Sequence, residues 1–303
     1  HVLKYQSAFA VFPATGCMNG GEADVPELHC KDGLFVGDTR ALSRFILRLN
    51  RSRVTAMGAV VGEGASVFSS NMANRRLHDS AGREIAAYGI HIDRERFLRQ
   101  SLHDRLRITN YSAGPVDLDV TLDCWADFRD IFEVRGVERA RRGQLHAPQV
   151  DGRNLIFGYR TLDDVEMRSA VRFDRDFDTE GGHVHFRLQL APGAGEEITT
   201  RVHVEAEGPA VTLPRPGDVD GAYETCKQET VDDFRARRDR FTLLRTNRPA
   251  FDEWLTNSAS DLAQLITELP TGPYPYAGTP WFSTPFGRDG IIAAWQMLWL
   301  DPS

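Results

Sequence analysis

Near its end, the sequence holds one short stretch whose residue types could bind a neutral sugar. It runs WFSTPFGRDG from Trp281 to Gly290 and joins two adjacent aromatic residues to an Arg-Asp pair. Aromatic rings pack against the apolar C–H face of a sugar, while guanidinium and carboxylate groups form charge-assisted hydrogen bonds with its hydroxyls. We therefore take Trp281, Phe282, Arg288 and Asp289 as candidate substrate-binding residues.

The same stretch also has a purely structural interpretation. Asp289 could cap the apolar helix that begins after Gly287, because a carboxylate near a helix N-terminus accepts unpaired backbone N–H groups. Trp281 and Phe282 could simply be core residues. Both interpretations stay open from the chemistry of these residues alone.

A carboxylate pair for acid and base catalysis could come from an acidic set in LDCWADFRDIFEVRG, namely Asp123, Asp127, Asp130 and Glu133. Arg129 and Arg135 lie among them in the sequence. Opposite charges so close together favour local ion pairs at a strand end over catalysis.

Metal chemistry has little support in the sequence. His183 and His185 share one face of an expected strand, but they alternate with apolar positions and so fall on its solvent side. The four cysteines are widely spread, without CxxC spacing: Cys17, Cys30, Cys124 and Cys226. We expect neither a metal site nor a disulfide scaffold, and a reducing cytoplasm as the location.

Other functional classes are also disfavoured. The GxSxG nucleophile motif is absent, and GEGASV has only two of the three glycines of a dinucleotide-binding loop. The net charge of −7 and the pI near 5.7 argue against nucleic acid and anionic membranes as partners. No apolar run reaches the roughly 20 residues that cross a bilayer.

The elements that must position these residues change type once along the chain. Up to about Glu207 the pattern is alternation, clearest in PVDLDVTLDCW, HVHFRLQL and EITTRVHVEA, which predicts antiparallel strands. Leu98, Leu102, Leu106 and Ile108 share a face, and the NYSAGP break after them is typical of a hairpin connection. Many such strands predict a large β-sandwich.

After the Pro/Gly-rich segment EGPAVTLPRPGD, the spacing becomes helical. A charged linker helix is expected within residues 216–245, followed by a helix that Asn247 caps and that ends at Leu269 before Pro270. A third helix begins after Gly287 and carries Trp295 and Trp299, which need partners to cover them. We therefore divide the chain into a β domain (residues 1–215), the linker helix (216–245) and the start of an all-α domain (246–303).

Four segments in this order resemble the N-terminal half of bacterial glycogen debranching enzymes of the amylo-α-1,6-glucosidase type. They are KDGLFVGDTRALSRFILRLN, RLRITNYSAGPVDLDVTLDCWADFRDIFEVRG, RNLIFGYRTLDD and YAGTPWFSTPFGRDGIIAAWQMLWLDPS. The resemblance implies an N-terminal β domain and then the first helices of an (α/α)6 toroid.

In related toroidal glycosidases an Arg-Asp pair after an aromatic segment contacts the terminal glucose unit. The resemblance extends this role to Arg288 and Asp289, and with them to Trp281 and Phe282. It implies hydrolysis of α-glucan branch points by two carboxylates, with no metal or organic cofactor. The catalytic acid and base are expected after Ser303, so this chain by itself should be inactive.

Two alternatives stand beside this interpretation. The protein could be a toroidal hydrolase of another α-glucoside, or the β domain could be a non-catalytic glucan-binding or packing module. The sequence does not determine linkage specificity, stereochemical outcome or oligomeric state.

Overall fold

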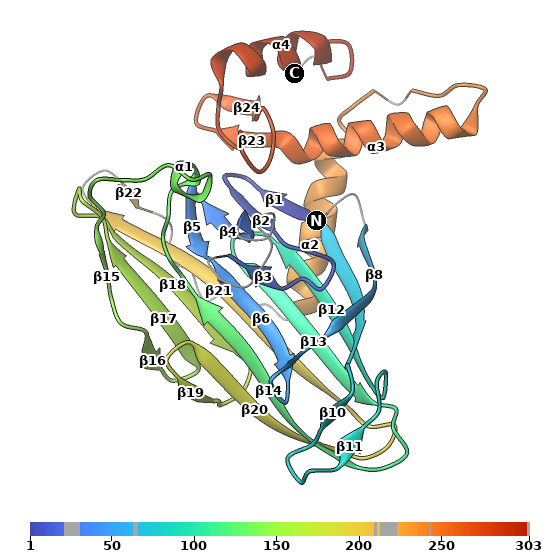
Figure 1. The fold of residues 1–303 in the computed structure, drawn as a ribbon. Helices are drawn as coiled ribbons and strands as arrows, with labels where there is room; N and C mark the ends of the chain where they lie inside the picture. The colour runs from blue at the N-terminus through green and yellow to red at the C-terminus, as the bar shows by residue number, and fades with distance from the viewer. Residues whose placement is uncertain (21–30, 63–65, 209–210, 213–222, 243, 302–303) are drawn as a thin grey trace.

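The computed structural model describes residues 1–20, 31–62, 66–208, 211–212, 223–242 and 244–301. A large antiparallel β-sandwich carries a helical segment at one end, and α2 runs along the side of the sandwich (Figure 1). Every strand pairing among these residues is antiparallel, as the alternating pattern predicts.

One layer of the sandwich is a 10-stranded sheet. Its main path runs, in spatial order, through β15 (Gln144–Leu145), β17 (Asn154–Arg160), β18 (Glu166–Phe173), β21 (Gly195–Gly208), β13 (Leu102–Asn110), β12 (Ile90–Leu98), β9 (Val67–Ala73) and β8 (Thr55–Gly62). Two short strands are added to it, β16 (Gln149–Asp151) on β17 and β22 (Val211–Thr212) on β21.

Two further sheets complete the sandwich. The 6-stranded sheet contains β19 (Asp178–Glu180), β20 (His183–Leu190), β14 (Val116–Trp125), β6 (Arg44–Leu49), β3 (Met18–Asn19) and, paired with β6, β7 (Ser52–Arg53). The 4-stranded sheet contains β1 (Val2–Tyr5), β2 (Ala8–Val11), β4 (Gly33–Val36) and β5 (Thr39–Leu42). A small hairpin, β10 (Leu77–His78) and β11 (Glu84–Ile85), lies apart from them. Apolar side chains of all three sheets meet in one core cluster, among them Leu34, Phe45, Leu106, Leu122 and Ile198.

A charged triad lies inside this apolar core. Arg94 and Arg96 on β12 both reach Asp104 on β13, with Nε to Oδ1 distances of 2.8 and 2.7 Å, and all three side chains are buried. Arg96 also lies over the rings of Phe12 and Phe45. Burial alone would raise the pKa of Asp104, but the two guanidinium groups outweigh it and hold that pKa below its usual value.

The strand patterns are confirmed in their alternation but not in all of their connections. Leu98, Leu102, Leu106 and Ile108 do face the core together. A turn separates Leu98 from Leu102, however, so they belong to two paired strands, β12 and β13.

The expected hairpin after β13 is wrong, because β13 and β14 lie in different sheets. The NYSAGP break is instead a crossing between the two layers. The amide of Asn110 organises the crossing by donating to the carbonyls of Gly114 and Leu190 and by accepting from Ser112.

The helix α2 (Tyr223–Arg238) lies on the outer face of the 10-stranded sheet. Its residues Cys226 and Val231 are buried against Val67 and Phe97. Tyr223 packs edge-on against Phe97, and its hydroxyl donates to the carbonyl of Glu95 at 3.0 Å. The first residues of the linker segment and the domain boundary at residue 215 lie outside the described residues.

The next helix, α3 (Pro249–Leu265), is shorter than its apolar pattern predicts. Residues up to Leu269 form the strand β23 (Ile266–Leu269), which pairs with β24 (Gly272–Pro275). Contacts with the β domain explain the change, because Lys4 Nζ donates to Thr267 Oγ1 at 2.8 Å and the amide of Glu268 donates to Gln6. The expected cap is also displaced: Arg248 occupies the N-cap position, without a side-chain cap bond.

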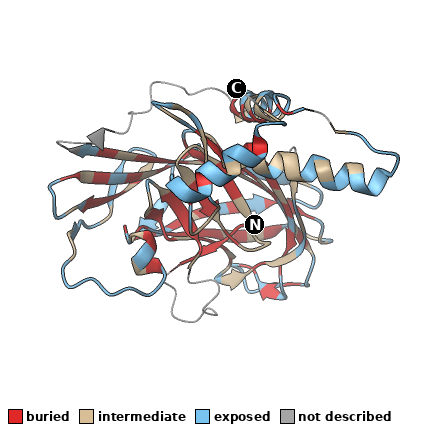
Figure 2. Ribbon diagram, turned by 90° about the horizontal axis from the view of Figure 1, so that it is seen from above, coloured by how far each residue is buried: buried red, intermediate tan, exposed pale blue. Residues whose placement is uncertain are grey.

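The last helix, α4 (Gly287–Met297), begins where the sequence predicts. Both α3 and α4 are largely solvent-accessible, as the exposed and intermediate colours of Figure 2 show. Trp295 is 73% exposed and Trp299 60% exposed, and Trp254 on α3 is also exposed. The continuation of these helices into a toroid, and with it the division at residue 246, stays a prediction.

Candidate functional site

The Trp281–Gly290 segment forms a tight connection between β24 and α4. A pair of backbone hydrogen bonds joins Gly278 and Phe282 in both directions, at 3.2 and 3.0 Å. The hydroxyl of Tyr274 on β24 donates to the carbonyl of Phe286 at 2.8 Å. These bonds fix the backbone on both sides of the aromatic pair.

The two aromatic residues have different surroundings. Trp281 is half-buried and packs against an apolar cluster of the β domain, formed by Phe9 and Phe35 together with Ile131 and Val134 of the short helix α1 (Ile131–Val134). Phe282 is 48% exposed, and its ring meets that of Phe286 edge-on with centroids 5.7 Å apart. The segment therefore turns one aromatic residue toward the β domain and the next toward solvent.

Cations lie near both rings. The Arg135 guanidinium carbon is 5.8 Å from the Trp281 ring centroid and 5.9 Å from that of Phe282. Lys31 Nζ also lies near Trp281, 5.5 Å from its ring centroid. Such distances are those of cation–π contacts.

The Arg-Asp pair lies in the first turn of α4. Arg288 is 85% exposed, and its Nη2 is 3.8 Å from Asp289 Oδ2. The N-cap residue is Phe286, and no side chain forms a cap hydrogen bond. Capping therefore does not occupy Asp289, and both charged groups face solvent with hydrogen-bonding capacity for a ligand.

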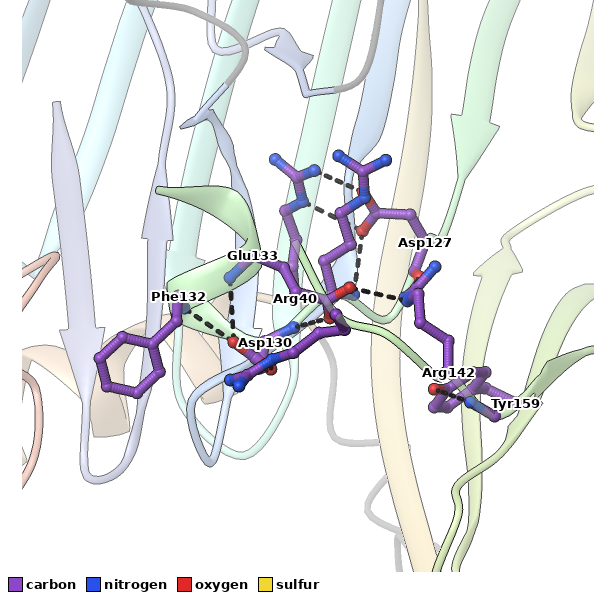
Figure 3. Close-up of polar contacts among 10 residues, drawn as sticks. Arg40, Asp127, Asp130, Phe132, Glu133, Arg142 and Tyr159 are labelled. Carbon is purple, nitrogen blue, oxygen red and sulfur yellow. Dashed lines mark hydrogen bonds and ion pairs between the residues drawn. The ribbon is translucent and has the colours of Figure 1, made fainter. Parts of the chain in front are cut away.

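Three of the four residues of the acidic set, Asp127, Asp130 and Glu133, lie in or just before α1 and are engaged by arginines (Figure 3), whereas Asp123 lies on β14. Asp130 caps α1 by accepting from the amides of Phe132 and Glu133, and the Glu133 carboxylate accepts from the amide of Asp130 in return. Arg139 pairs with Asp130 at 2.7 Å, and Arg142 pairs with Glu133 at 2.8 Å. The short helix is thereby fixed at both ends.

The other two carboxylates are also paired. Asp127 receives a two-pronged contact from the buried Arg40, one of whose bonds is Nε to Oδ1 at 3.0 Å. Asp123 lies 2.7 Å from Arg48 and 2.6 Å from His183. Burial would raise the pKa of Asp123, but the hydrogen bonds from these two partners outweigh it and the net pKa is lowered. Ion pairing is confirmed for this set, but the main partners of Asp123 and Asp127 come from distant strands and not from nearby in the sequence.

The two histidines do share a strand face, and each turns to a carboxylate of β14. His183 meets Asp123, and His185 Nδ1 lies 3.1 Å from Asp119. Among the residues that the structure describes, no group of three or more His, Cys, Asp or Glu side chains is placed to hold a metal ion.

Sequence reasoning missed the part that the β domain plays at this segment. The sequence indicates Arg135 only as a counter-ion for nearby carboxylates, and it gives no reason to prefer Phe286 within the Trp281–Gly290 stretch. Phe132 on α1 is exposed as well, with Arg139 over its ring. The signal available was the density of Arg and Phe in FRDIFEVRGVERARRG, but sequence spacing does not show which distant segment it faces.

A second feature of the helical segment is an apolar cavity of about 540 Å³ along α3, lined also by residues that follow α2 and α4. Phe241, Leu255, Leu262 and Trp299 are among its lining residues. In the described part of the chain, no helix combines the length and apolar character needed to cross a membrane.

Comparison with solved structures identifies the fold. A protein assigned as a kojibiose phosphorylase from the human microbiome superposes with a TM-score of 0.64 over 89% of this chain, at 9% sequence identity. This chain covers 40% of that protein's length. A protein assigned as an aldose 1-epimerase from Escherichia coli K12 is 9% identical over 68% of this chain and 98% of its own, with a TM-score of 0.35.

Comparison of the sequence with curated proteins finds no match. A family model for the N-terminal domain of some glycogen debranching enzymes, in contrast, matches residues 3–201. These residues include both layers of the sandwich, α1 and the paired acidic set. More than half of the chain is matched, and the chain therefore belongs to this family of glycogen debranching enzyme N-terminal domains.

Proposed function

We propose that this chain is part of a glycoside hydrolase that acts on α-glucan, and that Trp281, Phe282, Arg288 and Asp289 form one wall of its substrate site. The observation that carries the proposal is their arrangement: an exposed Phe282 ring lies close in sequence to a solvent-facing guanidinium and carboxylate. A ring face and paired polar groups are what a neutral sugar requires. Trp281 attaches this wall to the apolar cluster to which α1 contributes.

We further propose hydrolysis of α-1,6 bonds at glucan branch points, through an acid, a base and an oxocarbenium-like transition state. The family match supports a debranching role. The acid and base would come from residues that follow Ser303, because Asp123, Asp127, Asp130 and Glu133 are all held in ion pairs or caps. No cofactor enters this chemistry.

A non-catalytic glucan-binding role for the β domain is the second candidate. The pairing of its acidic groups with arginines favours it, because carboxylates engaged in ion pairs and caps are not free to act on a bound glucan. Hydrolysis of another α-glucoside is distinguished from both by comparing substrates in the full protein.

The test is a calorimetric titration of this chain with a trisaccharide that has one α-1,4 and one α-1,6 bond, which measures the dissociation constant. Arg288→Ala and Asp289→Asn should each weaken binding about ten- to hundredfold, since each removes a charge-assisted hydrogen bond of roughly 1.5–3 kcal/mol. The exposed Arg160, paired with Asp164 on the β domain, gives the control Arg160→Ala, which should bind as the parent does. Unchanged affinity in the first two variants would refute the sugar-contact role.

A further inference from the structure

Arg135 has a position that no other described residue shares. It follows α1 directly, and among the described residues it alone lies within cation–π distance of both Trp281 and Phe282. Trp281 comes from the helical segment, whereas Arg135 comes from the β domain. One guanidinium thus joins two parts of the chain that are about 150 residues apart in sequence.

The backbone that carries Arg135 is firmly fixed. Its amide donates to the carbonyls of Ile131 and Phe132, and the amide of Ile131 donates to Asp38 at 2.9 Å. The buried side chains of Ile131 and Val134 attach the helix to Phe9 and Phe35. The backbone therefore holds the base of the Arg135 side chain in a defined position.

The carboxylates closest to Arg135 in sequence already have other partners. Asp130 is held by Arg139 and Glu133 by Arg142. Within the described part of the chain, no carboxylate lies at ion-pair distance from Arg135. The interactions of its guanidinium that matter here are therefore those with the rings of Trp281 and Phe282. Because Arg135 is exposed, its charge also stays hydrated, and the contact acts on ring orientation more than on global stability.

We propose that Arg135 is a positioning residue of the sugar site: it clamps Trp281 and Phe282 and so fixes the direction in which the exposed face of Phe282 points. The sugar-binding part of this inference rests on the proposed function, whereas the clamp itself does not. A small rotation of an aromatic platform misplaces every hydroxyl relative to Arg288 and Asp289. The β domain would in this way take part in substrate recognition without touching the reacting bond.

The experiment compares Arg135→Met, which keeps an unbranched stem but removes the charged guanidinium, with Arg135→Lys, which keeps the charge. Arg141→Met is the matched control, because Arg141 is exposed and lies over no ring among the described residues. Two quantities are measured. One is hydrogen exchange at the amide of Phe282, which donates to the carbonyl of Gly278 at 3.0 Å. The other is the affinity for the trisaccharide.

Arg135→Met should speed exchange at Phe282 and weaken sugar binding, each about five- to thirtyfold, the range for two exposed cation–π contacts. Arg135→Lys should recover part of both effects, and Arg141→Met should match the parent. The midpoint of thermal unfolding should stay nearly constant in all three, which separates positioning from general damage.

If hydrogen exchange at Phe282 is unchanged in Arg135→Met, the clamp is overturned, whatever the effect on affinity for the trisaccharide. Faster exchange with unchanged affinity would overturn its role in sugar binding. A parent chain that binds no trisaccharide while Arg135→Met exchanges faster would leave the clamp supported and refute the proposed function of the wall, so the two ideas fail separately.

Discussion

Single charged residues in this protein are defined mainly by their distant partners. Asp104, Asp127 and Lys4 are buried or nearly so, and each meets its partner across strands or across the joint with the helical segment. A buried charge is tolerable only when it is paired and hydrogen-bonded, as Asp104 and Asp127 are, whereas Lys4 meets the neutral hydroxyl of Thr267. Substitutions at these positions should therefore change the free energy of unfolding far more than substitutions of exposed charged residues do.

Removing the charge of Asp104 should destabilise the sandwich severely. Asp104→Asn leaves two buried guanidinium groups with no counter-ion, at a cost of about 3–5 kcal/mol in the free energy of unfolding. Urea denaturation measures the change. Asp93→Asn, on the solvent side of the neighbouring strand β12, is the control and should stay within about 0.5 kcal/mol of the parent. Equal effects for the two variants would contradict the role given to the triad.

Lys4 should make stability depend on pH at the joint between β1 and β23. Burial first, and the nearby Arg237 second, lower its pKa from 10.5 to about 7. Between these values the unfolded state binds more protons than the folded state, so the unfolding free energy rises with pH, by up to about 1.4 kcal/mol per unit. Below pH 7 the destabilising effect is complete.

The variant Lys4→Met lacks the titrating group and supplies the reference. Its advantage over the parent in urea denaturation should be largest near pH 6 and should decline steadily toward pH 10. A difference between the two proteins that is independent of pH would show that Lys4 keeps its usual pKa in the folded state.

Sequence reasoning at this scale recognised the type of interaction but not the partners. Arg129 and Arg135 were the expected counter-ions of the acidic set because they are adjacent in sequence. The structure pairs Asp127 chiefly with Arg40, which is 87 positions away, and Glu133 with Arg142. Pairings of this kind depend on the sheet topology, which periodicity does not determine.

At the scale of elements, the period of the apolar residues predicted which segments are strands and which are helices. It failed where tertiary contacts decide, as at the end of α3, where Thr267 is drawn into a hairpin by Lys4. It also failed at the crossing after β13, because a turn sequence looks the same whether it returns within a sheet or passes to the opposite one. For the candidate site, the residue types of the sequence indicated the Trp281–Gly290 segment. They did not indicate that this segment packs against the apolar cluster to which α1 contributes.

The packing of α4 on β24 depends on the absence of a side chain at Gly290. A Cβ there would lie 2.0 Å from the hydroxyl oxygen of Tyr274 and 2.2 Å from its Cζ atom. Gly290→Ala should therefore displace Tyr274, break its bond to Phe286 and cost about 1–3 kcal/mol locally. Gly287→Ala, where a Cβ meets nothing within 4 Å, is the control.

Hydrogen exchange in residues 272–297 would reveal this local change. Faster exchange across α4 is expected for Gly290→Ala alone, while Gly287→Ala should match the parent or exchange more slowly. Similar behaviour of the two variants would show that Tyr274 rearranges without loss.

At the scale of the whole molecule, the β-sandwich is extensive while the helical segment presents exposed apolar side chains. Trp254, Trp295 and Trp299 are all more than half exposed. Apolar groups gathered in this way usually mark a surface that packs against something else. This agrees with the expectation from the sequence that these helices belong to a larger helical arrangement, which stays a prediction.

We expect this chain alone to hydrolyse no glycosidic bond. Cleavage needs a proton donor and a second carboxylate on opposite sides of the bond. Asp289 is the one acidic residue of the Trp281–Gly290 segment, and the carboxylates around α1 are held by arginines. Glucose release from a branched limit dextrin and from maltose measures the outcome, with a longer member of the family as positive control. Turnover by this chain would make Asp127, Asp130 and Glu133 the first catalytic candidates.

The position of β21 in the large sheet has a consequence for how the protein is made. It lies between β13 and β18, and its Val202 pairs with Leu102, a residue 100 positions earlier. During synthesis the edge of β13 therefore waits without a partner until β21 emerges, and such long-range pairing slows folding. The charged residues Arg105 and Arg107, which alternate with core residues along β13, would protect this waiting edge from joining the wrong chain.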